Sequence, residues 1–133
     1  MANEAALRNR YSDPVDFIVA DQTGVEKGAV LWLSGARVAS GVSNVAKPPF
    51  AGIAAREKIA SDGRTRLALF TDGIFDMTTA ATTNITRGAS VIISGVNTIC
   101  EAVAADLLTG AVIGKALETA TTSEVIQVEV GRG

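Results

Sequence analysis

The sequence contains no histidine and only one cysteine, Cys100. Without histidine the chain lacks the commonest general base, the usual nitrogen ligand of zinc, and the Ser-His and Cys-His nucleophile pairs. A single cysteine excludes an intrachain disulfide and a thiolate metal cluster. The glycine motifs of phosphate-binding loops and nucleophile elbows do not occur either. We therefore predict a protein that is not an enzyme and that uses no cofactor or metal.

The aromatic content, the net charge and the lengths of the apolar runs limit the classes of partner that the chain can bind. Aromatic residues make up 5% of the chain although hydrophobic residues make up 47%, so the core must be built from Val, Ile, Leu and Ala. The net charge is −2, and phosphate binding needs clustered cations. No apolar run approaches the roughly 18 residues that a membrane span needs, and the N-terminus lacks the apolar segment of a secretory signal. We expect neither nucleic acid nor a membrane as a partner.

One stretch of the chain occurs twice. Residues 25–35 and 85–95 share a β-branched residue, a spacer, a cation, Gly-Ala, an apolar run and Ser-Gly. The pattern predicts a short buried strand between two turns, because glycine reaches backbone angles that other residues avoid. The turn residues in question are Gly28, Gly35, Gly88 and Gly95.

A second echo relates residues 52–57 to residues 114–118, with Gly, Ala and a charge at matching steps. Together the echoes indicate an internal duplication, with units at about 15–77 and 84–130. The alternative is that turn-strand-turn units in any all-β chain converge on this pattern.

Alternating apolar and polar residues predict further strands. Residues 15–20, 64–71 and 124–130 alternate, and the last of these is expected to close the sheet with Ile126 and Val128 facing inward. We predict a mainly β protein, a compact single domain of the β-sandwich or barrel-like type, with at most one or two short helices.

Two local patterns carry more specific predictions. Asp72-Gly73 between residues 67–71 and 74–77 matches the two-residue hairpin signal. Apolar residues between Ile99 and Leu108 fall at helical spacing, although a strand through residues 96–100 fits nearly as well.

Residues 1–14 are polar and mixed in charge, and precede the main domain at residues 15–133. Pro14 disfavours a helix at Asp13, so any helix in this segment ends before that point. The segment is either a frayed terminus or an arm that orders on a neighbouring subunit or partner. We expect it to have little to bury, to be dispensable for folding, and to be needed for contact with the capsid or a neighbouring subunit.

Four stretches resemble a known family. Residues 14–29, residues 51–68, residues 71–77, and residues 114–120 together with 124–130 are similar to the capsid cement, or head decoration, proteins of tailed viruses of bacteria and archaea. The resemblance spans residues 14–130 and is weakest over 96–110. It implies a small β-rich protein, often trimeric, seated on an icosahedral shell where major capsid proteins meet.

The resemblance implies a non-enzymatic virion protein that is made in the host cytoplasm. It would bind the outer surface of the capsid and clamp neighbouring major capsid proteins. The implied partners are the major capsid protein and further copies of the chain, as a homotrimer. A head fibre or tail-tube component is the alternative. The candidate capsid or subunit contacts are Leu7, Arg8, Arg10, Tyr11 and Trp32. For Trp32 the simpler interpretation is a place in the hydrophobic core.

Overall fold

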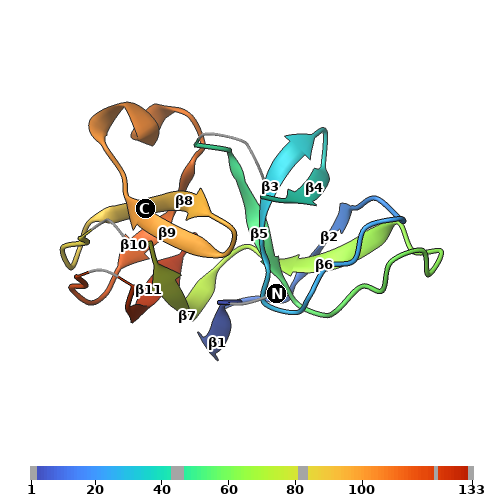
Figure 1. The fold of residues 1–133 in the computed structure, drawn as a ribbon, viewed down its shortest axis with the longest axis horizontal. Coiled ribbons are helices and arrows are strands. Elements are labelled where there is room, and N and C mark those ends of the chain that lie inside the picture. The colour runs from blue at the N-terminus through green and yellow to red at the C-terminus, as the bar shows by residue number, and fades with distance from the viewer. Residues whose placement is uncertain (1–2, 43–46, 81–83, 122, 132–133) are drawn as a thin grey trace.

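The computed structural model contains two five-stranded β-barrels that lie side by side (Figure 1). It describes residues 3–42, 47–80, 84–121 and 123–131. Barrel 1 has the strand order β2-β4-β3-β5-β6, and barrel 2 has the closed order β7-β11-β10-β8-β9. The strands of barrel 1 are β2 (Val15–Ile18), β3 (Val30–Gly35), β4 (Val38–Gly41), β5 (Phe50–Ala54) and β6 (Arg66–Phe70). Those of barrel 2 are β7 (Gly73–Thr79), β8 (Ser90–Gly95), β9 (Thr98–Glu101), β10 (Val112–Ala116) and β11 (Val125–Val130). The prediction of a mainly β, barrel-like fold is confirmed.

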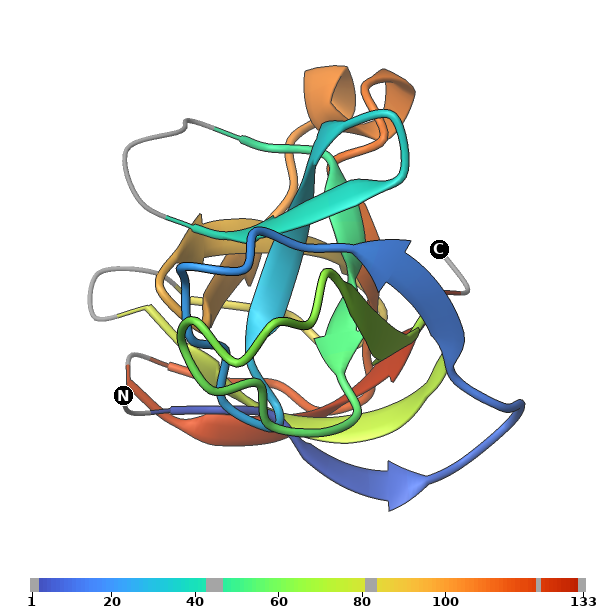
Figure 2. The same cartoon turned by 90° about the vertical axis from the view of Figure 1, so that its right-hand side faces the viewer.

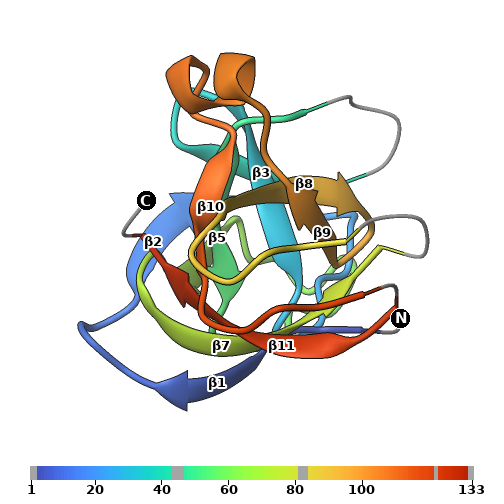
Figure 3. The same cartoon turned by 90° about the vertical axis from the view of Figure 1, so that its left-hand side faces the viewer.

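The two barrels repeat one topology. Each begins with a strand that pairs antiparallel with the last strand of its barrel and parallel with the second strand of the following hairpin. The parallel contacts are Ile18 with Val38 in barrel 1 and Thr78 with Thr98 in barrel 2. Figure 2 shows barrel 1 in front, and Figure 3 shows barrel 2 in front. The duplication suggested by the sequence echoes is thus present in the strand order, but the second unit begins at Gly73 with β7 and not near residue 84.

The Gly-Ala turns that open both echoes are built alike. Gly28 has a φ of 88° and Gly88 a φ of 89°. The Gly28 N–H donates to the carbonyl oxygen of Ala54 at 2.9 Å, and the Gly88 N–H donates to Ala116 at 2.7 Å. Each turn therefore fastens the start of one strand to the end of its neighbour. Gly35 and Gly95 end β3 and β8, where each hairpin turns.

The hairpin predicted at Asp72-Gly73 is wrong. β6 pairs with β2 and β5, whereas β7 pairs with β11, β9 and the N-terminal strand. The chain crosses here from barrel 1 to barrel 2, and Gly73 makes the crossing with a φ of 127°. The Asp-Gly signal indicates a sharp change in chain direction. Which strand β7 pairs with is decided by packing, because β7 buries alternate side chains in barrel 2.

The helix suggested across Ile99–Leu108 is also wrong for its first half, where the strand alternative is right. Thr98–Glu101 forms β9, and only Ala104–Leu108 forms a short 3-10 helix, η1. Ile99 is fully buried and Cys100 only partly, as expected for residues that alternate across a strand. No helix in the described part of the chain is long and apolar enough to cross a membrane.

The N-terminal segment belongs to the fold, so the frayed-terminus interpretation is wrong. Ala6–Asn9 forms strand β1, which pairs antiparallel with β7 in barrel 2. Ala5 is buried, and its N–H donates to the carbonyl oxygen of Gly28 in barrel 1 at 2.8 Å. The segment therefore touches both barrels, and the expectation that it has little to bury fails at Ala5.

Two hydrophobic cores meet at β3. Leu31 points into the core of barrel 1, whereas Val30 belongs to a second core that combines the interior of barrel 2 with the junction of the barrels. Trp32 is half-buried and packs against this second core. This position agrees with the simpler interpretation of Trp32 as a core residue.

The paired turns provide a test of the duplicated design. We expect Gly88→Ala to lower the free energy of unfolding by about 1–2 kcal/mol, through backbone strain alone. A Cβ at Gly88 meets no atom within 4 Å, whereas a Cβ at Gly28 would lie 2.4 Å from the Ala5 carbonyl oxygen. Gly28→Ala should therefore cost about 3 kcal/mol or more. Urea unfolding measures both costs.

Lys27→Gln is the control, because Lys27 is exposed, and it should change stability by no more than about 0.5 kcal/mol. Equal costs for the two glycine variants would show that Ala5 does not seat against the Gly28 turn.

Candidate interaction surface

Four of the five predicted contact residues lie together. Leu7 and Arg8 are on β1, and Arg10 and Tyr11 follow directly after it. Arg8 Nε lies 3.7 Å from Asp76 Oδ2, and the Tyr11 hydroxyl donates to Glu129 Oε2 at 2.6 Å. All four side chains are exposed at one end of barrel 2. Trp32 lies apart from them on β3.

β1 presents an unpaired edge. It is the end strand of its sheet, bound to β7 on one side, and among the described residues no strand pairs with its other side. A cavity of about 510 Å³ lies beneath it, lined by Ala5 and Leu7 on one side and by residues such as Ile53 and Phe75 on the other. Free strand edges carry unused backbone donors and acceptors and are common places for another chain to add.

The sequence did not reveal a second exposed surface, the η1 loop, which comprises residues 102–110. It projects from the top of barrel 2 and is the orange coil in Figure 3. Val103 and Leu107 are each 55% exposed, although both are large aliphatic residues. These two side chains offer apolar surface that a partner protein can bury.

The η1 loop is fixed by one buried carboxylate. Asp106 is only 3% exposed, and its Oδ2 accepts the Val103 N–H at 2.9 Å. Its Oδ1 lies 3.0 Å from Lys47 Nζ, which comes from barrel 1. The Val103 hydrogen bond, followed by the Lys47 ammonium, lowers the pKa of Asp106 below the usual Asp range. No pattern in the sequence singles out this aspartate, because its partners come from two parts of the chain.

The lowered pKa predicts an acid-sensitive loop. Because ionised Asp106 is favoured in the folded state, its stabilising effect is complete above the usual Asp pKa of about 4. That effect is lost as the pH falls through the lower pKa of the folded protein. The protection of the Val103 amide against hydrogen exchange, taken relative to its intrinsic exchange rate at each pH, should therefore fall only in that acidic range. Asp106→Asn keeps an acceptor but cannot titrate, and should remove this acid response; an unchanged response would assign it to another group.

A buried lysine organises the far end of barrel 1. The Lys58 side chain is fully buried, and its Nζ donates to the carbonyl oxygens of Asp21 at 2.7 Å and Ile59 at 3.1 Å. Asp62 Oδ1 lies 3.1 Å away and Asp21 Oδ1 lies 3.4 Å away. The pKa of Asp62 is lowered, first by the Arg64 N–H and also by Lys58. The ammonium thus ties two loops together as an internal cation.

Removing this cation should weaken barrel 1. Lys58→Met keeps the length of the side chain but leaves the surrounding oxygens without a donor, so we expect a loss of about 3 kcal/mol in the free energy of unfolding. Chemical denaturation measures this. Lys27→Met, at an exposed lysine, is the matched control and should be nearly neutral. Equal effects would mean that the cluster is not what holds the loops.

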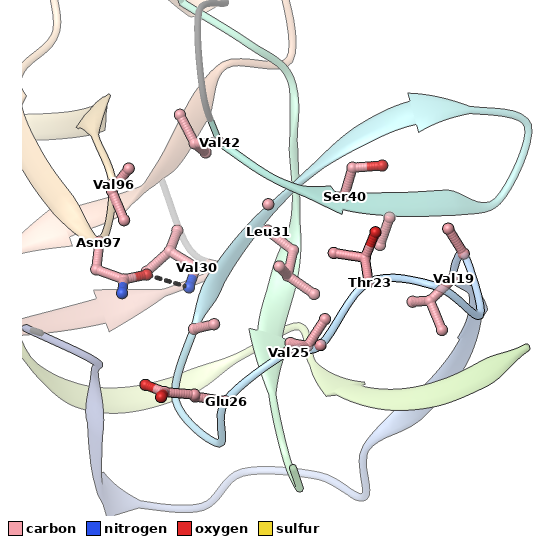
Figure 4. Close-up of a pocket in the computed structure, with 15 residues that line it drawn as sticks. Val19, Thr23, Val25, Glu26, Val30, Leu31, Ser40, Val42, Val96 and Asn97 are labelled. Carbon is pink, nitrogen blue, oxygen red and sulfur yellow. Dashed lines mark hydrogen bonds between the residues drawn. The ribbon is translucent and has the colours of Figure 1, made fainter. Parts of the chain in front are cut away.

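A second cavity, of about 290 Å³, lies between barrel 1 and the tip of the β8–β9 hairpin (Figure 4). Its lining is mainly apolar, with Leu31 and Val25 on one side and Val96 and Asn97 on the other. The Asn97 side-chain oxygen accepts the Val30 N–H at 2.9 Å, as the dashed line shows. Asn97 therefore acts as a polar tie between the barrels at the edge of this cavity.

The described residues contain no group of three or more His, Cys, Asp or Glu side chains placed to hold a metal ion. Asp72 and Asp76, which are close in sequence, have different partners: Asp72 accepts from the Ser12 hydroxyl, and Asp76 pairs with Arg8. Burial raises the pKa of the Cys100 thiol, so this group is protonated at neutral pH.

Comparison with known proteins adds one match. The model of a family described as phage cement protein matches residues 10–132 of the chain. The matched segment includes both barrels but begins just after β1. No curated protein matches the chain.

Proposed function

The chain belongs to the phage cement protein family, and on that premise we propose that it binds the outer surface of an icosahedral capsid and clamps neighbouring major capsid proteins. Family membership makes it a structural protein of a phage capsid, located in the virion. The observation that carries the proposal is the family match, because it extends over nearly the whole chain. We propose that residues 15–133 act as one decoration domain without catalytic activity.

We propose that the η1 loop is an anchor on the major capsid protein. Val103 and Leu107 offer apolar side chains to a partner, and the buried Asp106 holds their backbone in place before binding. Preorganisation reduces the entropy lost on association, and aliphatic groups that become buried at a contact provide its main driving force.

We propose that copies act together, as a homotrimer. Several weak contacts held in one oligomer bind far more tightly than a single contact, provided that all can engage at once. β1 lies at the bottom of Figure 1 and the η1 coil at the top. We assign Leu7, Arg8, Arg10 and Tyr11, on β1 and directly after it, to contacts between subunits. Trp32 remains a core residue with an exposed portion.

The proposal is tested by binding purified protein to empty expanded capsids of the parent virus. The double variant Val103→Asp with Leu107→Asp should weaken binding by about tenfold or more, because charges replace apolar anchors. Val125→Asp is the control, since Val125 is 63% exposed on β11 in the same barrel, and it should bind like the wild type.

Thermal melting must show that all three proteins fold. If the wild type does not bind capsids, the proposed function is wrong, and assembly of the purified protein into long polymers would favour a tail-tube component. If the double variant binds normally, the function stands but the η1 loop is not the anchor.

A further inference from the structure

The repeat makes β2 of barrel 1 the counterpart of β7 of barrel 2. Both are the first strands of their barrels, and both pair with the last strand and with the second strand of the following hairpin. The contact of Ile18 with Val38 matches that of Thr78 with Thr98. Residues of β2 and β7 can therefore be compared position by position.

The comparison reveals one difference. One edge of β7 has two partners: β9 pairs with residues 78–79, and β1 pairs with residues 74–76 (Figure 3). On β2, the matching residues are 14–16, and no strand of the described chain pairs with that edge. Barrel 1 thus has an empty counterpart of the place that β1 fills on barrel 2.

The residues at this open edge of β2 resemble the residues of β7 that contact β1. Phe75, which pairs with Leu7 of β1, is 1% exposed, whereas its counterpart Val15 is 42% exposed. Asp76, which lies beside Arg8, has its counterpart in Asp16, an exposed aspartate. An uncovered aliphatic side chain and an aspartate therefore stand where β1 would supply Leu7 and Arg8.

The backbone at this edge also faces outward. The Ile18 N–H donates to the carbonyl oxygen of Arg37 in the neighbouring hairpin, and backbone groups two residues apart on a strand point to the same side. The groups of Asp16 therefore point to the open edge, where its carbonyl oxygen accepts from Arg37 Nη2 at 2.6 Å. This contact comes from an exposed side chain whose guanidinium also lies 5.1 Å from the centre of the Phe17 ring, and an incoming strand would replace the contact with Asp16.

We propose that the edge of β2 at residues 14–16 receives the free edge of β1 from a second copy of the chain. The result is a continuous sheet, β7-β1 of one copy followed by β2 of the next. Leu7 would cover Val15 of the neighbour, and Arg8 would lie between its own Asp76 and the neighbour's Asp16.

Charge and strand position favour a second copy as the occupant. Arg8 keeps 55% of its side chain exposed beside Asp76, so it has room for a second carboxylate. β1 is held on β7 by one edge, so its other edge is open to a different molecule. Because β1 and β2 are different surfaces, the contact is head-to-tail, and such contacts close into rings when the rotation permits. The inference adds a subunit contact to the proposed function and does not involve the η1 loop.

Trapping across chains tests the contact directly. In a Cys100→Ser background, protein with Leu7→Cys is mixed with tagged protein carrying Val15→Cys and is mildly oxidised. We expect a disulfide-linked product of one tagged and one untagged chain. Ile18→Cys replaces Val15→Cys in the control, because Ile18 is similarly exposed at 38% but its edge is already paired with β4. Equal yields from both mixtures, or none from either, would overturn the proposal.

Charge reversal provides an independent measurement. By sedimentation velocity, Asp16→Lys should weaken self-association by about tenfold or more, because it faces Arg8 with a like charge. Adding both Arg8→Asp and Asp76→Lys to the same chain should restore association, since the reversed charge at position 8 then lies between opposite charges in its own chain and in the neighbour. Melting curves establish that both variants fold.

The remaining outcomes are decisive. A wild-type protein that is monomeric at every concentration overturns the proposal, as does Asp16→Lys with unchanged association. If Asp16→Lys associates normally but loses capsid binding, the edge is taken by a capsid strand and the proposal is wrong. If association weakens while single copies still bind capsids, the proposal and the proposed function both stand.

Discussion

The structure depends on the first half of β3, whose side chains pack into a core on each face of the strand. Leu31 fills the core of barrel 1, while Val30 and Trp32 face the second core. A strand shared in this way has no polar face, which explains why its sequence is an uninterrupted apolar run. The buried hydrogen bond from the Val30 N–H to Asn97 fixes the same strand to the β8–β9 hairpin. The barrels are consequently joined by core packing and by a directional contact, so surfaces on one barrel hold a defined position relative to the other.

The two barrels have kept one topology and diverged in what they carry. Lys58 and Ala120 occupy matching bridge positions, opposite Val25 and Ile85, yet one is a buried cation and the other a small apolar residue. Barrel 1 needs the ammonium to hold its loops, whereas barrel 2 carries β1 and the η1 loop. The two barrels thus share one strand topology, and β1 and the η1 loop give barrel 2 a different surface from barrel 1.

Local features were predictable from the sequence where the cause is local. The turns at Gly28 and Gly88 follow from glycine alone, and the alternation in β11 identifies its inward residues Ile126 and Val128. The hairpin at Asp72-Gly73 failed because a turn signal says nothing about which strand becomes the partner. β1 was missed as a strand because four exposed residues gain their order from β7 rather than from their own pattern.

The candidate surface was predictable only in part, for the same reason. The exposed segment from Leu7 to Tyr11 is visible as a mixed polar stretch near a proline, and the structure does bring these residues together. Lys58 looks like any lysine in a polar turn, and Asp106 like any surface acid. Their roles arise from oxygens and amides contributed by distant residues, such as Asp21 for Lys58 and Lys47 for Asp106.

The pairing of β1 with β7 has a consequence for how the chain can be divided. The first strand completes the last barrel, so the boundary between the barrels in space is not a boundary along the chain. A fragment that ends at Phe70 retains barrel 1 together with a strand that has lost its partner. A fragment that begins at Gly73 retains barrel 2 with the edge of β7 uncovered. The molecule therefore cannot be cut into two self-sufficient halves at any single peptide bond, although its architecture is that of two equal parts.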